Sequence, residues 1–367
     1  MFNKYVARLC ADIERSQEIG RQMGGLLPSE ADSIYFGGGT PTLLDVSQLE
    51  RVFVTIRQNF EVLSAAEITM ECAPGTLSAG MIECFERNRV NRVSLGVQSF
   101  VDQEARSVGR LHNRETVLED IARLRSAGVS NINVDLIAGL PHQTRESWER
   151  SLDVLIATGV PHASIYMLEV DADSRLGREL IRGGQKYHAH FVPDEDLITD
   201  LQERACERLN AAGIQQYEIS NFARNGFESK HNLKYWTRQP YIGFGVDAHS
   251  MLMADSQLRD VNAVRFSNPD NLDAYSVAAP AHVTVVSREA ALEEAYFLGL
   301  RLTRGVHLRN IAAEFVNHAI EEDIIAECIA SGLMEQQGDV IRLTPKGRLL
   351  SNEVFEKFVS TPATQDG

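Results

Sequence analysis

Residues that could bind a ligand follow short apolar stretches in the first part of the chain. In chain order they are Gly37-Gly38-Gly39-Thr40-Pro41, Glu71, Gln98, Arg110, Asp135 and Ile137. The three glycines allow the backbone to approach a ligand closely. The side chains supply a carboxylate for an ammonium group, an amide and a guanidinium for a carboxylate, and a second carboxylate for a ribose diol. That set fits an amino-acid nucleoside such as S-adenosylmethionine.

Each of these residues also has a structural explanation when it is taken alone. The glycines could form a tight turn. Glu71 could be a solvated strand end, Arg110 a surface cation, and Asp135 a helix cap or an ion-pair partner. The glycine run is neither a Walker loop nor a GxGxxG fingerprint, so it does not indicate phosphate binding. The nucleoside hypothesis therefore rests on the combination of residues.

The stretches that carry these residues alternate with helical patterns. Apolar, β-branched runs occur at Ser33–Phe36, Glu67–Glu71, Arg92–Gln98, Ile132–Ile137 and Ala163–Leu168, with a weaker sixth run at Gln215–Ile219. Between them, apolar residues recur with the 3.6-residue period of a helix. Strands that alternate with helices predict βαβ units and a parallel sheet, and ligands bind at the carboxyl ends of such strands. The expected fold class is α/β, a partial (βα)6 barrel of the TIM type.

The two ends of the chain depart from this repeat. Residues 3–19 predict a helix with no strand before it, so we expect the first strand of the repeat to be missing from this sequence. Beyond residue 285, helical patterns and a short strand at Val340–Leu343 predict a small, α-rich, winged-helix-like domain. The expected division is 1–225 for the part-barrel, 226–285 for a connecting segment, 286–360 for the small domain and 361–367 for a disordered tail.

Composition argues against several protein classes. The chain has 51 acidic and 36 basic residues, a formal net charge of −15, which argues against a nucleic-acid partner. No apolar run is long enough to span a membrane, and no secretory signal opens the chain. The cysteines have neither disulfide-framework nor zinc-site spacing, which predicts a reducing, cytoplasmic compartment and no metal site in this chain. They are Cys10, Cys72, Cys84, Cys206 and Cys328.

A second candidate site lies in the segment His231-Asn232-Leu233-Lys234-Tyr235-Trp236. Taken alone, this segment could be a surface histidine beside two rim aromatics. Histidine is also a common axial ligand of haem iron, and aromatic rings suit the face of a porphyrin. His231, Tyr235 and Trp236 are therefore candidate haem-binding residues, and His249 is a further candidate ligand.

The motifs resemble those of the radical S-adenosylmethionine superfamily. The strings Tyr35-Phe36-Gly-Gly-Gly-Thr-Pro-Thr42, Asn133–Pro141 and Tyr217–Ala223 are similar to its oxygen-independent coproporphyrinogen III oxidase-like branch. The likeness runs from the first helix to Gly347, which is nearly the whole chain. It implies the radical S-adenosylmethionine part-barrel as the fold and S-adenosylmethionine as a cofactor.

The resemblance also implies a role for each residue of the first site. The Gly-Gly-Gly-Thr-Pro turn, assisted by Glu71, meets the methionine amino group of the cofactor in that family. Gln98 and Arg110 match residues that hold its carboxylate. Asp135 matches a ribose contact and Ile137 an adenine contact.

Within the branch, the HNxxYW pattern from His231 to Trp236 resembles the haem chaperones of the HemW type. This implies haem as a ligand and haem-accepting respiratory proteins as partners. The alternative is a radical enzyme that oxidatively decarboxylates coproporphyrinogen III, so the resemblance leaves open whether the chain is catalytic. It also leaves open a homodimer and a peripheral membrane contact.

Two departures from the family pattern bear on the cofactor. Ala73 stands where the family has an asparagine, in Glu71-Cys72-Ala73-Pro74-Gly75. The family's CxxxCxxC segment, whose thiolates hold a [4Fe–4S] cluster, is absent, and Cys10 has no partners at that spacing. In the family that segment follows the strand that we expect to be missing. The cluster is therefore expected only in a longer form, and a cluster-free relative that binds haem or a nucleoside is a third hypothesis.

Overall fold

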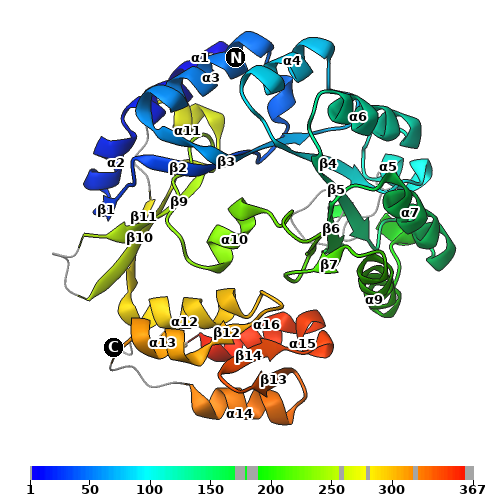
Figure 1. Cartoon of the computed structure of the whole chain (residues 1–367), viewed down its shortest axis with the longest axis vertical. Coiled ribbons are helices and arrows are strands. Elements are labelled where there is room, and N and C mark those ends of the chain that lie inside the picture. Colours follow the sequence, from blue (N-terminus) through cyan, green and yellow to red (C-terminus); the bar gives the residue numbers. More distant parts are fainter. Residues whose placement is uncertain are drawn as a thin grey trace. The chain divides into compact units, whose positions relative to one another are not determined.

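The computed structural model describes residues 2–169, 178–179, 189–255, 260–277, 282–316 and 321–359. The chain forms two compact units, coloured by sequence in Figure 1. The first unit comprises Met1–Asp32, Glu50–Ser64 and Lys230–Gly367, and the second comprises Ser33–Leu49 and Ala65–Ser229. The expected tail at 361–367 lies outside the described residues, and the boundaries expected after 225 and 285 stay a prediction. No helix in the described ranges is long and apolar enough to cross a membrane.

The second unit is built on a seven-stranded sheet with the order β2-β3-β4-β5-β6-β8-β7 (Figure 1). The strands are β2 (Glu30–Phe36), β3 (Glu61–Cys72), β4 (Arg92–Gln98), β5 (Asn131–Ala138), β6 (His162–Met167), β7 (Gln215–Gln216) and β8 (Asn221–Ala223). β2 and β3 begin in segments of the first unit. The pairs β3–β4, β4–β5 and β5–β6 are parallel. The predicted α/β class and the first five predicted strands are confirmed.

The sixth predicted strand, Gln215–Ile219, is wrong in its extent. β7 ends at Gln216, and the sheet continues through β8, which pairs antiparallel with both β6 and β7. The buried Glu218 carboxylate stabilises this reversal, because it accepts hydrogen bonds from the Ser220 N–H at 3.0 Å and from Asn221 Nδ2 at 2.6 Å. The apolar pattern of this segment therefore reflects a tight turn between two short strands.

Helices cover the parallel strands of the second unit. They are α4 (Ala79–Arg87), α5 (Asp102–Ser107), α6 (Arg114–Ser126), α7 (Arg145–Thr158) and α9 (Glu195–Ala211), with 3-10 turns η1 (Pro41–Leu43) and η2 (Ala189–Phe191). A further helix, α3 (Val46–Asn59), begins in this unit and belongs to the first unit from Glu50 onward. Four helices are capped by a side chain that accepts from the backbone N–H three residues on. The caps are Ser78, Asn113, Thr144 and Asp194. Val93, Ser94 and Leu95 are consecutive residues of β4 and all are buried, as expected for a parallel strand covered on both faces.

The first unit contains a four-stranded antiparallel sheet that the sequence did not predict. Its order is β1-β9-β10-β11. The strands are β1 (Gly25–Leu26), β9 (His249–Ala254), β10 (Val261–Ser267) and β11 (His282–Ser287). Leu252, Val264 and Phe266 form a buried cluster on this sheet. The N-terminal strand β1 joins the sheet through pairing with β9, far away in the sequence.

Helices of the first unit pack around this sheet and at its margins. They are α1 (Phe2–Glu14), α2 (Ser16–Gln22), α10 (Lys230–Trp236) and α11 (Leu272–Ser276). The predicted helix at 3–19 is thus two helices, which meet at Arg15. α1 buries Val6, Leu9 and Ile13 on one face, and the Tyr275 hydroxyl of α11 donates to Asp12 at 2.7 Å. This hydrogen bond ties the start of the chain to α11.

The C-terminal part of the first unit alternates helices with a small sheet. Its elements are α12 (Arg288–Gly299), β12 (Val306–His307), α13 (Leu308–Glu314), α14 (Glu322–Ala330), β13 (Met334–Gln337), β14 (Val340–Leu343), α15 (Pro345–Leu349), α16 (Ser351–Phe355) and η3 (Glu356–Phe358). The strands pair antiparallel in the order β12-β14-β13. Helices followed by a hairpin agree with the winged-helix-like pattern of the sequence.

Candidate functional site

The Gly37-Gly38-Gly39 turn follows β2 and leads into η1. A Cβ atom at Gly37 would lie 2.3 Å from the Tyr35 ring and 2.7 Å from Glu71 Oε1, so only glycine fits. Gly38 has a φ of +78°, which also favours glycine. At Gly38 and Gly39 an added Cβ would meet nothing within 4 Å, so the turn borders open space. It therefore exposes bare backbone to which a ligand can come close.

Glu71 lies beside this turn at the carboxyl end of β3. Its Oε1 accepts a hydrogen bond of 2.6 Å from the Tyr35 hydroxyl, and the Gly38 N–H also bonds to the carboxylate. Burial raises the pKa of Glu71, and these two hydrogen bonds oppose the rise. Burial and the adjacent carboxylate raise the pKa of Tyr35, so its phenol remains a donor. Glu71 is thus held in one orientation, as a contact for an ammonium group requires.

The side chains of Gln98 and Arg110 both lie close to Gly96 of β4. A Cβ atom at Gly96 would lie 3.3 Å from Gln98 Nε2 and 3.8 Å from Arg110 Nη2. The register between β4 and β5 shifts between Leu95 and Gln98, and Gln98 has a φ of +69°. This local irregularity turns the end of the strand, as bulges near ligand sites do. An amide donor beside a guanidinium suits a carboxylate.

Asp135 lies on the neighbouring strand β5. Its Oδ1 accepts from Asn133 Nδ2 at 2.7 Å, and its Oδ2 accepts from Ser94 Oγ at 3.1 Å. Burial raises the pKa of Asp135, and hydrogen bonds from Ser164 and the other polar neighbours oppose the rise. Burial lowers the pKa of Arg110, and the Asp135 carboxylate opposes that fall. Ile137 follows on the same face of β5 and is half-buried, so an apolar contact adjoins the carboxylate.

Thr40 and Pro41 shape the chain after the glycines. Thr40 is the N-cap of η1 and Pro41 occupies its first turn, where proline's fixed φ suits the helix. The Thr42 and Thr76 hydroxyls lie 2.7 Å apart, which fastens the turn to the segment after β3. In that segment the Ala73 carbonyl accepts from the Thr76 hydroxyl at 2.7 Å. A backbone contact therefore organises the position where the family has an asparagine side chain.

Several polar residues of this site were missed by sequence reasoning. They are Tyr35, Ser94, Asn133, His162 and Ser164. The signal that could have found Asn133 is the period of a strand. Asn133 and Asp135 are polar residues two positions apart in an otherwise apolar run, so they point to one face.

The second predicted motif forms the short helix α10 in the first unit. His231 and Tyr235 lie four residues apart on it, and their rings meet edge to face with centroids 4.9 Å apart. Tyr235 meets Tyr241 in the same way at 4.6 Å. Lys234 Nζ lies 2.6 Å from Asp32 Oδ1, which fastens the helix to the start of β2. The three rings form one aromatic group, called the α10 cluster below.

Trp236, the last residue of α10, is supported from another element. The guanidinium carbon of Arg301 lies 4.2 Å from the centroid of its ring, a cation–π contact. The ring centroids of Tyr235 and Trp236 are 6.4 Å apart. The structure therefore gathers the predicted haem residues in the first unit and the predicted nucleoside residues in the second.

The cysteines do not form a metal site. Cys206 is half-buried and the other four are buried, all as free thiols. Burial also raises the pKa of Cys72, which keeps that sulfur protonated. Among the residues that the structure describes, no three His, Cys, Asp or Glu side chains gather as metal ligands would. The residues of the first site thus fit S-adenosylmethionine. The described residues do not supply the ligand set of a [4Fe–4S] cluster.

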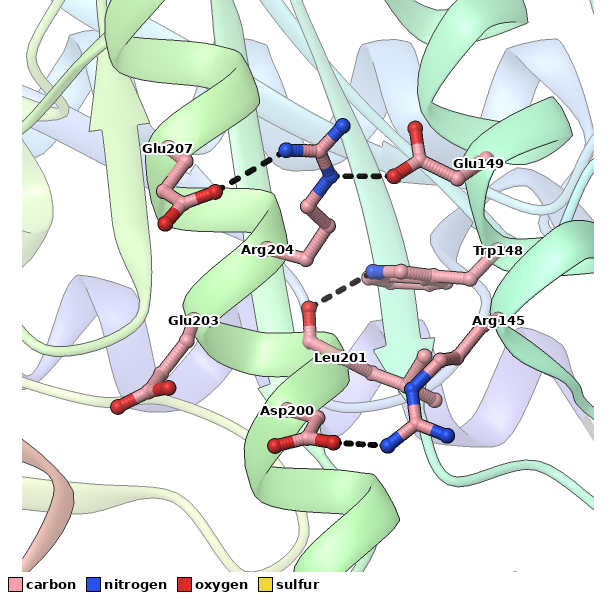
Figure 2. Close-up of a pocket in the computed structure, with 8 residues that line it drawn as sticks. All are labelled: Arg145, Trp148, Glu149, Asp200, Leu201, Glu203, Arg204 and Glu207. Atoms are coloured by element: carbon pink, nitrogen blue, oxygen red, sulfur yellow. Dashed lines mark hydrogen bonds and ion pairs between the residues drawn. The ribbon is translucent and has the colours of Figure 1, made fainter.

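A separate cavity of about 260 Å³ lies between α7 and α9 (Figure 2). Its lining consists of Arg145, Trp148, Glu149, Asp200, Leu201, Glu203, Arg204 and Glu207. Figure 2 shows ion pairs within the lining: Arg145 with Asp200, and Arg204 with Glu149 and Glu207. The Trp148 indole N–H donates to the Leu201 carbonyl at 2.8 Å. None of the predicted site residues lines this cavity, and its mutual ion pairs indicate a helix–helix contact.

Two family models match separate parts of the chain. Residues 11–155 match the Radical SAM superfamily, and residues 286–350 match the HemN C-terminal domain. The chain is similar in structure to coproporphyrinogen III oxidase (HemN) from Escherichia coli, described as a radical SAM enzyme, with a TM-score of 0.80. That match covers 97% of this chain and 83% of the other at 21% sequence identity, so it shows the fold.

Curated relatives extend the likeness over most of the chain. Heme chaperone HemW of Lactococcus lactis subsp. lactis is 34% identical over 333 residues, which cover 89% of this chain and 84% of the relative. Heme chaperone HemW of Bacillus subtilis is also 34% identical, over 89% of this chain and 85% of the relative. That of Escherichia coli K12 is 30% identical, over 90% and 85%. The chain therefore belongs to the HemW family of the radical SAM superfamily.

Proposed function

We propose that this protein binds haem and passes it to haem-accepting respiratory proteins, on a scaffold that also binds S-adenosylmethionine. The observation that carries the haem part is the α10 cluster, in which the His231 ring meets Tyr235 and Tyr235 in turn meets Tyr241. Aromatic rings beside a histidine offer both an iron ligand and an apolar face for a porphyrin. The names of the HemW relatives support the proposal, since they describe haem chaperones.

His231 is the proposed iron ligand of the cluster. Burial raises the pKa of Tyr235 to about 12, so its phenol is protonated at neutral pH and does not offer a phenolate to iron. Burial also raises the pKa of Tyr241. An imidazole, in contrast, is a common axial ligand of haem iron.

The nucleoside part of the proposal rests on the carboxyl ends of β2 to β5. Glu71 would accept from the ammonium group, Gln98 and Arg110 would hold the carboxylate, and the remaining contacts would fall to Asp135 and Ile137. In the superfamily this cofactor supplies a 5′-deoxyadenosyl radical when a reduced cluster cleaves it. The described residues do not fit a cluster, so the proposal for this chain is limited to nucleoside binding.

The haem part is tested by titrating hemin into the protein while recording the Soret band. We expect His231→Ala to weaken binding roughly tenfold or more, about 1.4 kcal/mol, and to shift the band. His307→Ala is the matched control, because this histidine is half-exposed and pairs with Asp339 on the C-terminal sheet. Unchanged affinity and spectrum in His231→Ala would remove the support, and the same loss in His249→Ala instead would move the ligand to that residue.

The competing function is oxidation of coproporphyrinogen III, which the structural likeness to HemN suggests. A longer form of the protein that carries the CxxxCxxC segment, reconstituted with a cluster, is given coproporphyrinogen III, S-adenosylmethionine and a reductant. We expect no protoporphyrinogen, and we expect haem-loaded protein to transfer haem to an apo respiratory haem protein. Formation of protoporphyrinogen would overturn a role restricted to haem delivery. A cytoplasmic location, a homodimer and a peripheral membrane contact stay predictions.

A further inference from the structure

A line of hydrogen bonds runs through the second unit and ends on the Asp135 carboxylate. The Ser229 backbone N–H donates to the Tyr217 oxygen at 3.3 Å, and that oxygen lies 3.0 Å from His162 Nε2. On the other side of the imidazole, His162 Nδ1 lies 2.6 Å from Asn133 Oδ1. The amide nitrogen of Asn133 then donates to Asp135 Oδ1 at 2.7 Å. These hydrogen bonds thus connect the segments before and after β8 to the strands β6 and β5.

The chemistry of the groups allows one direction for the protons along this line. A carboxylate only accepts, so Asn133 must turn its NH₂ toward Asp135 and its oxygen toward the histidine. That oxygen needs a donor, so His162 Nδ1 carries the hydrogen. Burial lowers the pKa of His162 well below its usual value, so the ring is neutral and Nε2 has no hydrogen. Nε2 therefore accepts from the Tyr217 hydroxyl.

Burial makes this arrangement rigid. His162 and Ser229 are 0% exposed and Asn133 is 2% exposed, so water cannot replace a lost partner easily. Reversing one group would leave two acceptors or two donors facing each other in a low-dielectric interior. The alternative amide orientation of Asn133 would point an oxygen at the carboxylate, and the donors on His162 and Tyr217 exclude it.

We propose that His162 and Tyr217 are positioning residues that hold the Asp135 carboxylate in the orientation needed to accept from a ribose hydroxyl. Neither residue touches the nucleoside in this inference; both act through Asn133. It rests on the proposed function, because it takes Asp135 as the ribose contact. Its consequence is specificity: the line should make the site prefer a ribose to a deoxyribose.

The test compares two ligands that differ by one hydroxyl, 5′-methylthioadenosine and its 2′-deoxy analogue, by calorimetric titration. We expect the wild-type protein to bind the ribose form about tenfold more tightly, as a hydrogen bond to a charged group allows. Tyr217→Phe and His162→Phe should reduce that ratio to about threefold or less, mainly by weakening the ribose form. His162→Asn should restore much of it, because its amide N–H can donate from the place of Nδ1.

Two further variants separate the possible failures. Tyr275→Phe, which removes a buried hydroxyl bonded to Asp12 in the first unit, is the matched control and should keep the wild-type ratio. Asp135→Asn should abolish the preference, and if it does not, the ribose contact and this inference both fail. If Asp135→Asn abolishes the preference while Tyr217→Phe keeps it, only the positioning role is overturned. Equal weakening of both ligands by His162→Phe and Tyr217→Phe would also overturn it, as the sign of a purely structural role.

Discussion

The two candidate sites of this protein are built in opposite ways. The nucleoside site lies at the ends of buried parallel strands, and its carboxylates are each held by two or more hydrogen bonds. The α10 cluster joins two residues of a seven-residue helix on which no residue is buried, His231 and Tyr235, with Tyr241 from the segment after it. Its rings contact one another at their edges, and the helix itself is supported by one ion pair and one cation–π contact. One site is held by a hydrogen-bonded interior, and the other by a few contacts at a half-exposed helix.

The difference suggests how each site would respond to its ligand. A carboxylate fixed by buried donors loses little freedom when a small polar molecule binds, which favours selectivity. A short helix with half-exposed aromatics can adjust to a large flat molecule and release it again. Substitutions in the nucleoside site should therefore affect stability and binding together, whereas those around α10 should affect mainly haem.

The largest effect is expected at Gly37. Gly37→Ala would drive a Cβ into the Tyr35 ring and Glu71, which should lower the free energy of unfolding by about 1–3 kcal/mol and abolish measurable nucleoside binding. Gly39→Ala is the matched control for stability, since nothing lies within 4 Å of its Cβ position. Denaturant unfolding of both variants and ligand titration of Gly37→Ala provide the measurement. Equal stability of the two variants would show that the turn is less tightly packed than its geometry indicates.

A smaller effect with a defined pH dependence is expected at Glu71. Burial raises the folded-state pKa of this carboxyl, so the folded state holds its proton more tightly than the unfolded state, whose pKa is about 4.3. The contribution of the Glu71 carboxyl to the free energy of unfolding is therefore fully present below the unfolded-state pKa. That contribution is lost as the pH rises through the folded-state pKa. Glu71→Gln should therefore raise the melting temperature relative to wild type at pH 7 but not at pH 4.

The exposed Glu203→Gln serves as the control for that experiment, because it removes a carboxylate from the surface of α9. Its effect on the melting temperature should be the same at both pH values. Glu71→Gln should also weaken nucleoside binding while it stabilises the fold. A Glu71→Gln protein that is less stable than wild type at pH 7 would contradict the assignment of a destabilising buried charge.

Around α10 the expected effects on stability are smaller. Lys234→Met removes the ion pair with Asp32, whose carboxylate is more than half exposed, so the loss should be about 0.2–1 kcal/mol and should shrink at high salt. A double-mutant cycle with Asp32→Asn isolates the pair. A coupling well above this range would mean that α10 is held as firmly as the strands of the nucleoside site.

The smallest effect is expected for Tyr235→Phe. The ring that meets His231 and Tyr241 is kept, and only a protonated phenol is lost, so haem affinity should stay within about twofold of wild type. The Soret titration described for His231→Ala measures it directly. A large loss or a shifted band would instead make Tyr235 an iron ligand and would reverse the roles within the α10 cluster.

Parts of both sites could be predicted from local patterns. Continuous apolar runs located β4 and β5 to within a residue, because strands buried on both faces have few polar positions. The residues at their ends were predicted to converge, and Gln98 and Arg110 do meet above Gly96. The antiparallel sheet of β1, β9, β10 and β11 was not predicted. β1 has only two residues, and its pairing with β9 depends on a segment at the other end of the chain.

The amino-acid sequence by itself determined which residue types stand at the strand ends and which helices begin at capped positions, since these follow from the periods and capping preferences of local structure. Tertiary structure alone decided how the polar residues behind Asp135 meet one another. His162, Tyr217 and Asn133 belong to separate segments, and none of them shows in its own stretch which partner it will face. The reason is that a buried donor must find an acceptor wherever packing places one, and packing is a property of the whole unit.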